Sequence, residues 1–437
     1  VSYIMITISN NPLDQVRNLC LNALNKMKGL KKSYKGFFTL MMSVYLSTYN
    51  RLTFLQMARE TSSCESRFRQ NCKRDFDWLE FNANAYMTNI YNRQRSAVAI
   101  DPSFLHKSGL RTVGVGEFWS GCDSAVKLGL EFLCLALVDA DINTAIALFA
   151  VQTIKEEALG LKDFPDYICQ CEHGLIKLYL KALYEQKDRL LEINERIVAD
   201  SYFAVKPFVS GVNAMGFDLI SRLHDNAVMR YLCTDKPTGR RGRPKLYEGK
   251  VNLNALDENV FETQHLIIND KQVTLQSAVV NVKSFNRNCK VVIVTYHDTK
   301  KKKQVRKIYF STDITMSAID IFDIYRTRFQ IEFLFRDAKE YMGLEHCQAR
   351  SKEALNFCYN MSLASVNMAR DIARQWEKES GTRLSVGDVK IIMHNMALYQ
   401  RIRIKLGFPN LTNPNNNSDT EWATLNDLLL FGVKAAA

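Results

Sequence analysis

The segment from Tyr325 to Lys339 (YRTRFQIEFLFRDAK) carries side chains that could act on a phosphate. On a helix of about 100° per residue, five polar side chains fall within about 80° of arc. They are Tyr325, Arg328, Glu332, Arg336 and Lys339. One carboxylate among three cations and a phenol suits a metal-binding group beside cations that grip phosphates. An exposed, salt-bridged helix face is the common alternative, but such a face would mix its charges and would not isolate one glutamate.

The composition fits a basic globular protein of several domains. The 437 residues include 58 Lys+Arg against 46 Asp+Glu, a formal net charge of +12. This length predicts two to four domains, and the positive surplus favours a nucleic-acid partner, although basic charge alone is weak evidence. Eleven scattered cysteines, an odd number, indicate a reducing compartment. Because no apolar run reaches about 18 residues and no signal segment is evident, we expect an intracellular, cytoplasmic protein without a membrane partner.

The first 90 residues are poor in proline and predict helices. Residues 52–58 (LTFLQMA) and 64–76 (CESRFRQNCKRDF) are separated by a polar turn, which suits a helix-turn-helix. The second segment presents Arg67, Arg69 and Lys73, which we take as DNA-binding candidates. A plain helical hairpin with a solvated basic face is an equally good interpretation of these residues alone.

Residues 91–230 predict three strands, a helix, a strand, a helix and a strand. The expected segments are, in order, 96–100, 126–138, 143–154, 167–185, 196–199, 205–214 and 217–223. Asp101 follows the first strand, and Asp200 follows the short strand at 196–199. The polar turn at Ala140-Asp141 predicts that the second and third strands are antiparallel neighbours.

Residues 231–311 form a basic stretch that is rich in predicted strands, including 274–282 and 290–296. Its opening segment 237–245 (PTGRRGRPK) is a loop by its Gly and Pro content. Arg241 and Arg243 in this loop resemble short arms that read a minor groove. Three helices follow, at 319–341, 353–376 and 386–406, and the Asn-rich segment 408–419 predicts turns.

The spacing Tyr-x2-Arg-x3-Glu-x6-Lys resembles the signature of bacterial insertion-sequence transposases with a DDE catalytic core, the "IS four" group. Here it is made by Tyr325, Arg328, Glu332 and Lys339. The flanking segments 328–332, 335–339 and 343–350 are also similar to that family. Upstream, Ala99-Ile-Asp101 and Val198-Ala-Asp200 match the positions at which the family places its two aspartates, each at the end of a strand. The resemblance covers most of the chain.

The resemblance implies an α/β fold: an RNase H-like catalytic core interrupted by a β-rich insertion, with helical N-terminal DNA-binding and C-terminal helical regions. The expected divisions are 1–90 (DNA-binding, helix-turn-helix-like), 91–230 (first part of the core), 231–311 (insertion), 312–365 (core with the catalytic helix) and 366–437 (C-terminal helices). The family also has a tryptophan in the insertion that stacks on a flipped base. This insertion has none; its candidate aromatics are Phe261, Phe285, Tyr296 and Tyr309.

The chemistry that the resemblance implies is two-metal phosphoryl transfer. Asp101 would bridge two Mg²⁺ ions, for which Mn²⁺ is a possible substitute, and Asp200 and Glu332 would each hold one. Water would free a 3′-hydroxyl at the element end, and that hydroxyl would attack again, through a DNA hairpin. Tyr325, Arg328 and Lys339, with Arg336 as a further candidate, would hold DNA phosphates. The implied partners are double-stranded DNA and a second copy of the chain, with residues after 366 as the candidate dimer contact, in the bacterial nucleoid.

Three alternatives remain open. Asp101 before Pro102 suits a turn, and Asp200 suits a helix cap, so the chain could be a catalytically silent DNA-binding regulator of the same fold. It could be another RNase H-like nuclease, although such an enzyme would not need the long insertion. A plain helix-turn-helix repressor would leave most of the chain unexplained.

Overall fold

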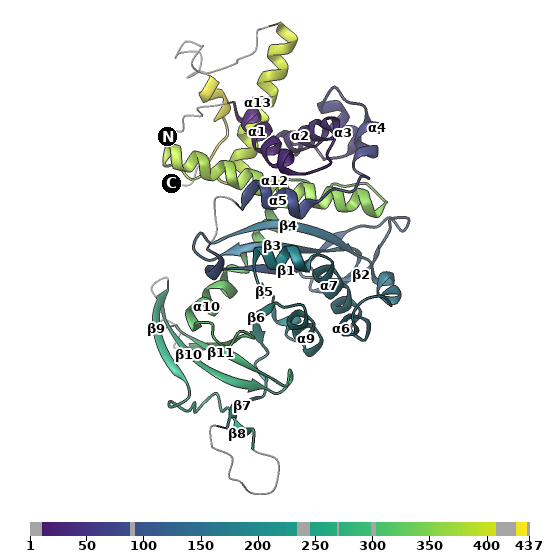
Figure 1. Cartoon of the computed structure of the whole chain (residues 1–437). Helices are drawn as coiled ribbons and strands as arrows, with labels where there is room; N and C mark the ends of the chain where they lie inside the picture. The colour runs from purple at the N-terminus through teal and green to yellow at the C-terminus, as the bar shows by residue number, and fades with distance from the viewer. Residues whose placement is uncertain are drawn as a thin grey trace.

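The computed structural model describes residues 11–87, 92–233, 245–268, 271–298, 303–407 and 425–434. Arg241 and Arg243, and the Asn-rich segment 408–419, lie outside these ranges. The described part of the chain is a mixed α/β structure around a twelve-stranded mixed sheet (Figure 1).

The central strands are β1 (Ser96–His106), β2 (Gly116–Ser120), β3 (Ala125–Asp139), β4 (Thr144–Thr153), β5 (Arg196–Val198) and β6 (Asp218–Leu223). β2 was not predicted, and the strand predicted to end before Asp101 continues to His106, so Asp101 lies inside β1 and not at its end. β3 pairs antiparallel with β1 on one side and with β2 and β4 on the other, which confirms the predicted antiparallel hairpin. β5 lies between β1 and β6 and is parallel to both. A left-handed residue, Asn143 (φ 47°), closes the β3–β4 turn.

The basic stretch after residue 228 continues the same sheet. Its strands are β7 (Met229–Leu232), β8 (Tyr247–Lys250), β9 (Glu262–Ile268), β10 (Lys271–Val282), β11 (Arg287–Asp298) and β12 (Lys303–Ser311). All pair antiparallel, and β12 joins the central sheet through β6. In Figure 1 these strands extend away from the central strands and helices.

Helices cover both faces of the central strands (Figure 1). The α-helices are α1 (Pro12–Lys26), α2 (Lys32–Ser47), α3 (Phe54–Glu60), α4 (Glu65–Asn71), α5 (Trp78–Tyr86), α6 (Asp166–Cys169), α7 (Gly174–Glu185), α8 (Lys187–Ile193), α9 (Lys206–Ala214), α10 (Ala318–Thr327), α11 (Gln330–Glu340), α12 (Lys352–Ser380) and α13 (Val386–Leu406). Short 3-10 turns are η1 (Arg93–Arg95), η2 (Lys155–Gly160) and η3 (Ser201–Phe203). Alternate residues of β1 enter different cores: Ala97 and Ala99 pack with α12, and Val98 and Ile100 pack with α7 and α9.

Two helix predictions were wrong about continuity. The helix predicted over 319–341 is two helices, α10 and α11, with a break at Arg328 and Phe329. At the break the backbone forms three-residue hydrogen bonds, from Phe329 N–H to Arg326 O (3.3 Å) and from Glu332 N–H to Phe329 O (3.1 Å). The segment predicted as one helix over 167–185 is α6 and α7, because the polar residues 170–173 interrupt its apolar stripe.

Asparagines of α12 hydrogen-bond the free edge of β4. Asn360 accepts a hydrogen bond from the N–H of Ala150 in β4 and donates one to the carbonyl of the same residue (both 2.7 Å). Asn367 accepts from the N–H of Ala147 (3.0 Å) and donates to the carbonyl of Ala147 (2.9 Å). Asn356 accepts from Gln152 N–H (2.8 Å) one turn earlier. These amides take the place of a further strand, and they fix α12 along the sheet edge.

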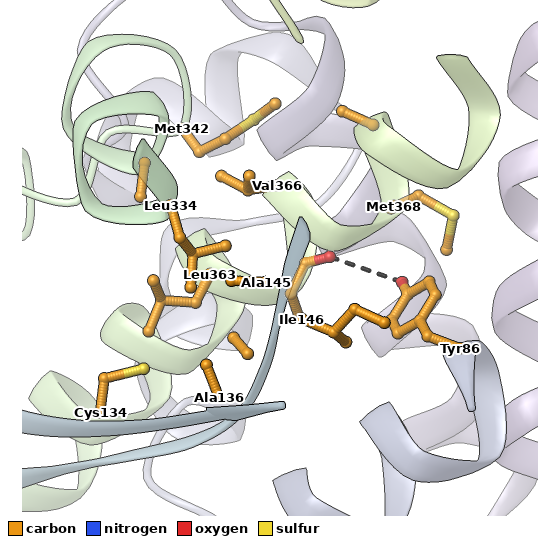
Figure 2. Close-up of a cluster of buried hydrophobic side chains, with 14 of the residues drawn as sticks. Tyr86, Cys134, Ala136, Ala145, Ile146, Leu334, Met342, Leu363, Val366 and Met368 are labelled. Atoms are coloured by element: carbon orange, nitrogen blue, oxygen red, sulfur yellow. Dashed lines mark hydrogen bonds between the residues drawn. The ribbon is translucent and has the colours of Figure 1, made fainter. Parts of the chain in front are cut away.

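α11 is fixed in turn by packing on α12. Figure 2 shows Leu334 of α11 beside Leu363 and Val366 of α12, with side chains of β3 and β4 in the same cluster. The predicted domain boundary at 365/366 falls inside α12, which runs unbroken through it. The helix that bears Glu332 is therefore anchored to the central sheet both through α12 and by its own contacts with β4, β1 and β3.

Candidate active site

The parallel pairing of β1 and β5 brings two of the predicted carboxylates together. Ala99 lies opposite Val198 in this pairing, and Asp101 and Asp200 each follow two residues later. Asp101 is still within β1, where it faces Cys134 of β3. Asp200 lies just beyond β5, where the chain turns into η3. The carboxyl end of a parallel strand pair is a common position for functional side chains.

Asp200 also caps the short turn η3, the role that the sequence offered as an alternative to a catalytic one. Its Oδ1 accepts a hydrogen bond from Tyr202 N–H (3.0 Å), and Ser221 Oγ donates to its backbone carbonyl (2.7 Å). The cap fixes where the side chain starts and leaves the second carboxylate oxygen for another partner.

Glu332 reaches the same region from the first turn of α11. Arg328 Nη2 donates to Glu332 Oε1 (3.3 Å), and the Arg328 side chain is only 12% exposed while Glu332 is 42% exposed. Arg328 also lies over the Tyr325 ring (5.7 Å), which stacks on Tyr309 (4.4 Å between centroids). The break between α10 and α11 thus places a nearly buried guanidinium against the glutamate.

The electrostatics indicate that the three carboxylates share this guanidinium. Burial raises the pKa of Asp101 to about 8, Arg328 opposes that rise, and the charges of Asp200 and Glu332 add to it. Burial also raises the pKa of Glu332, and Arg328 lowers it. Burial lowers the pKa of Arg328, but the neighbouring carboxylates outweigh burial and raise it above its ordinary value. One cation therefore faces three carboxylates.

The donor chemistry of this group fits a divalent cation. Three carboxylates with one neighbouring guanidinium leave negative charge uncompensated, and hard oxygen ligands suit Mg²⁺ or Mn²⁺. Within the residues described, however, no three His, Cys, Asp or Glu side chains are gathered closely enough to hold a metal ion. Glu332 is turned toward Arg328, and Asp200 accepts its cap bond. Ligation would require those side chains to rotate.

The rest of the predicted helical stripe divides at this site. Lys339 Nζ donates to the carbonyl of Phe104 in β1 (3.1 Å) and pairs with Glu345 (3.4 Å), so it lies along the strand that carries Asp101. Arg336 lies one turn beyond Glu332 in the same helix, but its side chain is 61% exposed and pairs with Asp337. The guanidinium of Arg336 is therefore held by Asp337, and only Lys339 of the two is bound to the strand that carries Asp101.

Sequence reasoning missed a fourth carboxylate, Glu131 on β3. It is buried, accepts a hydrogen bond from Tyr179 Oη (2.7 Å), and contributes to the raised pKa of Asp101. An isolated glutamate inside the apolar run 128–138 was the signal that could have identified it.

The two helices predicted at 52–58 and 64–76 correspond to α3 and α4, which pack against each other, but α4 ends at Asn71 and Lys73 lies beyond it. Arg67, Arg69 and Lys73 are exposed; Arg67 donates to Ser63 Oγ (2.7 Å), and Arg69 pairs with Glu65. Arg69 and Lys73 line a cavity of about 880 Å³ with two more cations, Lys107 and Arg350. In the part of the chain that the structure covers, no helix has the length and apolarity to cross a membrane.

Comparison with known protein families gives a match over part of the chain. Residues 179–368 match the family model of the transposase DDE domain. The matched range contains Asp200, Arg328 and Glu332, and Asp101 precedes it. No curated protein matches the chain. The family match supports a transposase of the DDE type, with a DNA substrate and nuclease activity.

Proposed function

We propose that this chain is an insertion-sequence DNA transposase of the "IS four" group, which cuts transposon ends and transfers the freed 3′-hydroxyl to target DNA. One observation carries the proposal: the pairing of β1 with β5 brings Asp101 beside Asp200, and Arg328, which is hydrogen-bonded to Glu332, interacts electrostatically with all three carboxylates. The transposase DDE match covers two of these three carboxylates.

The strand arrangement supports an RNase H-like core with an insertion. The order β4-β3-β1-β5-β6, with β3 antiparallel to its neighbours and β1, β5 and β6 parallel, is the arrangement expected of that core. Along the chain, strands β7 to β12 come after these five strands and before the helix that carries Glu332. This position suits an insertion that contacts DNA beside the cutting site.

The chemistry would begin with hydrolysis. A water oxygen attacks the phosphorus at the transposon end, the bond to the 3′ oxygen breaks, and that oxygen takes a proton to become the 3′-hydroxyl. The hydroxyl then attacks a phosphodiester of the opposite strand, which closes a hairpin and releases a 3′-hydroxyl on the flanking DNA. A second water hydrolyses the hairpin and frees the transposon 3′-hydroxyl again. That hydroxyl attacks a target phosphodiester, and the 3′ oxygen of the target strand leaves and takes a proton. Two divalent cations held by Asp101, Asp200 and Glu332 would supply charge neutralisation and activation of the attacking oxygen. Arg328, Tyr325 and Lys339 would hold the phosphates in line.

Two copies of the chain would pair two transposon ends. The far end of α13 presents an apolar stripe that supports a dimer contact there: Leu398, Ile402 and Leu406, each four residues apart, are all exposed. The basic helix α4 and the loop with Arg241 and Arg243 would contribute DNA contacts, and the action on DNA places the protein at the bacterial nucleoid.

The test is cleavage of DNA that carries candidate ends, with Mg²⁺ or with EDTA. Glu332→Gln is expected to lower cleavage by about 10³-fold or more while DNA binding is retained, because the amide cannot ligate as a carboxylate does. Glu340→Gln, an exposed acid on the same helix, is the matched control. Binding without cleavage by either wild type or variant would favour a regulator. Equal cleavage by wild type and Glu332→Gln would show that Glu332 is not catalytic.

A further inference from the structure

A second basic cavity lies on another face of α11. Its volume is about 800 Å³, and its walls come from α11, α12, the β3–β4 turn and the segment before α13. Three carboxylates and five cations line it. The cations are Arg336, Arg370, Arg374, Arg383 and Lys434. Asp337 belongs to this wall and lies about 140° around α11 from Glu332. The cavity is therefore separate from the carboxylate site.

A buried carboxylate holds two of these arginines side by side. Asp337 is nearly buried; its Oδ1 accepts from Arg336 Nη2 (3.0 Å) and its Oδ2 from Arg370 Nη2 (2.8 Å). Arg370 Nη1 also donates to the carbonyl of Ala145 (3.2 Å). One negative charge compensates two positive charges here, so the trio keeps a net positive charge in a fixed orientation.

Two further arginines add charge without an ion pair. Over the ranges that the structure describes, neither Arg374 nor Arg383 forms a salt bridge, and the hydrogen bond of Arg374 runs from its Nε to Arg370 O (3.3 Å). Arg374 is one helical turn from Arg370, and its pKa is lowered, first by burial and then by the Arg370 charge, against the opposing charges of Asp371 and Asp139. A half-buried guanidinium at Arg374 and an exposed one at Arg383, both beside the charge of Arg370 in one cavity, favour an anionic ligand.

Aromatic rings flank the arginines. Phe333 lines the cavity, and its ring lies edge-on to that of Phe329 (5.1 Å), which is 47% exposed. The Arg336 guanidinium lies over Phe333 (4.7 Å). Exposed rings among arginines are the combination with which proteins hold the bases and phosphates of a nucleic-acid strand. A small anion would not need the rings.

We infer that this cavity binds the sugar-phosphate backbone of a DNA segment other than the one held at the carboxylates. Arg374 and Arg383 contact its phosphates, and Phe329 and Phe333 offer a stacking surface for an adjacent base. Since α11 bears both sites, a DNA segment bound here is held at a fixed position relative to Glu332. The inference goes beyond cleavage and does not depend on it.

The test measures binding of a short fluorescein-labelled DNA of random sequence by anisotropy, over a range of salt concentrations. Every chain carries Glu332→Gln, so that cutting does not interfere. Arg374→Gln/Arg383→Gln is expected to weaken binding by about tenfold or more and to reduce the slope of log affinity against log salt by about 2. The charge-matched control is Lys162→Gln/Lys378→Gln, two exposed lysines outside the cavity, with an expected change of less than about twofold.

A photocrosslinking benzoylphenylalanine at position 383 gives a second readout, since Arg383 is exposed and its replacement should not disturb the core. Crosslinks to DNA from 383 but not from 378 are expected.

Equal DNA binding and equal salt slopes for the two double variants would overturn the inference. The inference would also be overturned if Arg374→Gln/Arg383→Gln lost self-association in sedimentation while its DNA affinity stayed unchanged, which would assign the cavity to a protein contact. Full displacement of DNA by inorganic phosphate at matched phosphate concentration would overturn it too. If the wild type, which has Glu332, cuts DNA but the two double variants bind DNA equally, only this inference fails. If the wild type never cuts DNA but the two double variants differ in DNA binding, only the proposed function fails.

Discussion

At the scale of single residues, Asp101 stands out because its charge is buried among like charges. Its neighbours Asp200, Glu332 and Glu131 all disfavour its ionised form, and Arg328 favours it. Such an arrangement is unfavourable for the folded chain by itself and becomes favourable when a divalent cation binds. Catalytic groups are often held at a cost in stability in this way.

Asp101→Asn should therefore stabilise the metal-free protein while it abolishes cleavage. Above pH 8, where the Asp101 carboxyl is ionised, we expect the melting temperature in EDTA to rise by about 2–4 °C, because the amide removes a charge that the neighbouring carboxylates repel, worth on the order of 1 kcal/mol. Added Mg²⁺ should raise the melting temperature of the wild type but not of the variant. Asp225→Asn, at an exposed acid, is the control; a variant that melts below the wild type in EDTA would contradict the expected repulsion.

Sequence reasoning placed Arg328 and Glu332 correctly on neighbouring turns, because residues four apart meet on any helix. Arg336 lies one turn beyond Glu332 in α11, as predicted, but its guanidinium pairs with Asp337, a contact that the helical projection did not show. The break at Phe329 between α10 and α11 was not predicted, because local patterns give no sign of it. Glu131 was missed because its partner, Tyr179, lies 48 residues away.

At the scale of elements, α12 is attached to the sheet by side-chain amides as well as by apolar packing. Asn360 is 2% exposed and satisfies both the N–H and the carbonyl of Ala150. Asn360→Ala leaves two buried backbone groups unsatisfied, so we expect a loss of about 2–4 kcal/mol in the free energy of unfolding by urea. Lys378→Ala on the exposed face of the same helix should change it by less than about 0.5 kcal/mol. Equal values for the two variants would mean that packing alone holds α12.

Lys390 links three helices from α13. It is buried, and its Nζ donates to the carbonyls of Tyr45 (3.0 Å), in the last turn of α2, and of Tyr341, at the end of α11. Burial lowers the pKa of Lys390 from 10.5 to about 7. Between these two values the unfolded chain binds the extra proton and the folded chain does not, so this group makes the protein more stable as pH rises.

Comparison with Lys390→Met isolates that contribution. The difference in unfolding free energy, wild type minus variant, should increase by up to about 1.4 kcal/mol per pH unit above pH 7 and level off near the unfolded pKa. Urea unfolding at several pH values measures it, and Lys378→Met, at an exposed lysine, should show no such trend. A difference that is flat in pH would mean that Lys390 keeps its proton in the fold.

The central strands and most helices could be predicted from sequence because their apolar runs are bounded by turn residues. Segment 143–154, for example, begins at the left-handed Asn143 and corresponds to β4. Pairing of β12 with β6 could not be predicted, since it joins residues about 90 positions apart and depends on the whole sheet. The amides of α12 also gave no local signal, because asparagine in a helix is usually exposed.

At the scale of the whole molecule, the exposed end of α13 is the proposed contact between two copies. Ile402 and Leu406, one turn apart, are 49% and 65% exposed. Ile402→Glu/Leu406→Glu should leave the melting temperature unchanged and shift the DNA-bound species from two chains to one in sedimentation, because charge would be placed in an apolar contact. Leu159→Glu, at an isolated exposed leucine elsewhere, is the control. Two chains on DNA in the double variant would place the dimer contact on another surface.

The asparagines that line β4 have a consequence for how copies of this chain can meet. The unpaired backbone groups of a free sheet edge can pair with any extended chain. At β4, side chains of α12 already hydrogen-bond to these groups. Growth by strand addition at β4 is thus blocked while α12 stays docked. The block works through backbone groups alone, so the side chains of β4 are free to change without reopening it. Release of α12 would expose the edge, and crowded chains would then be open to aggregation at this position.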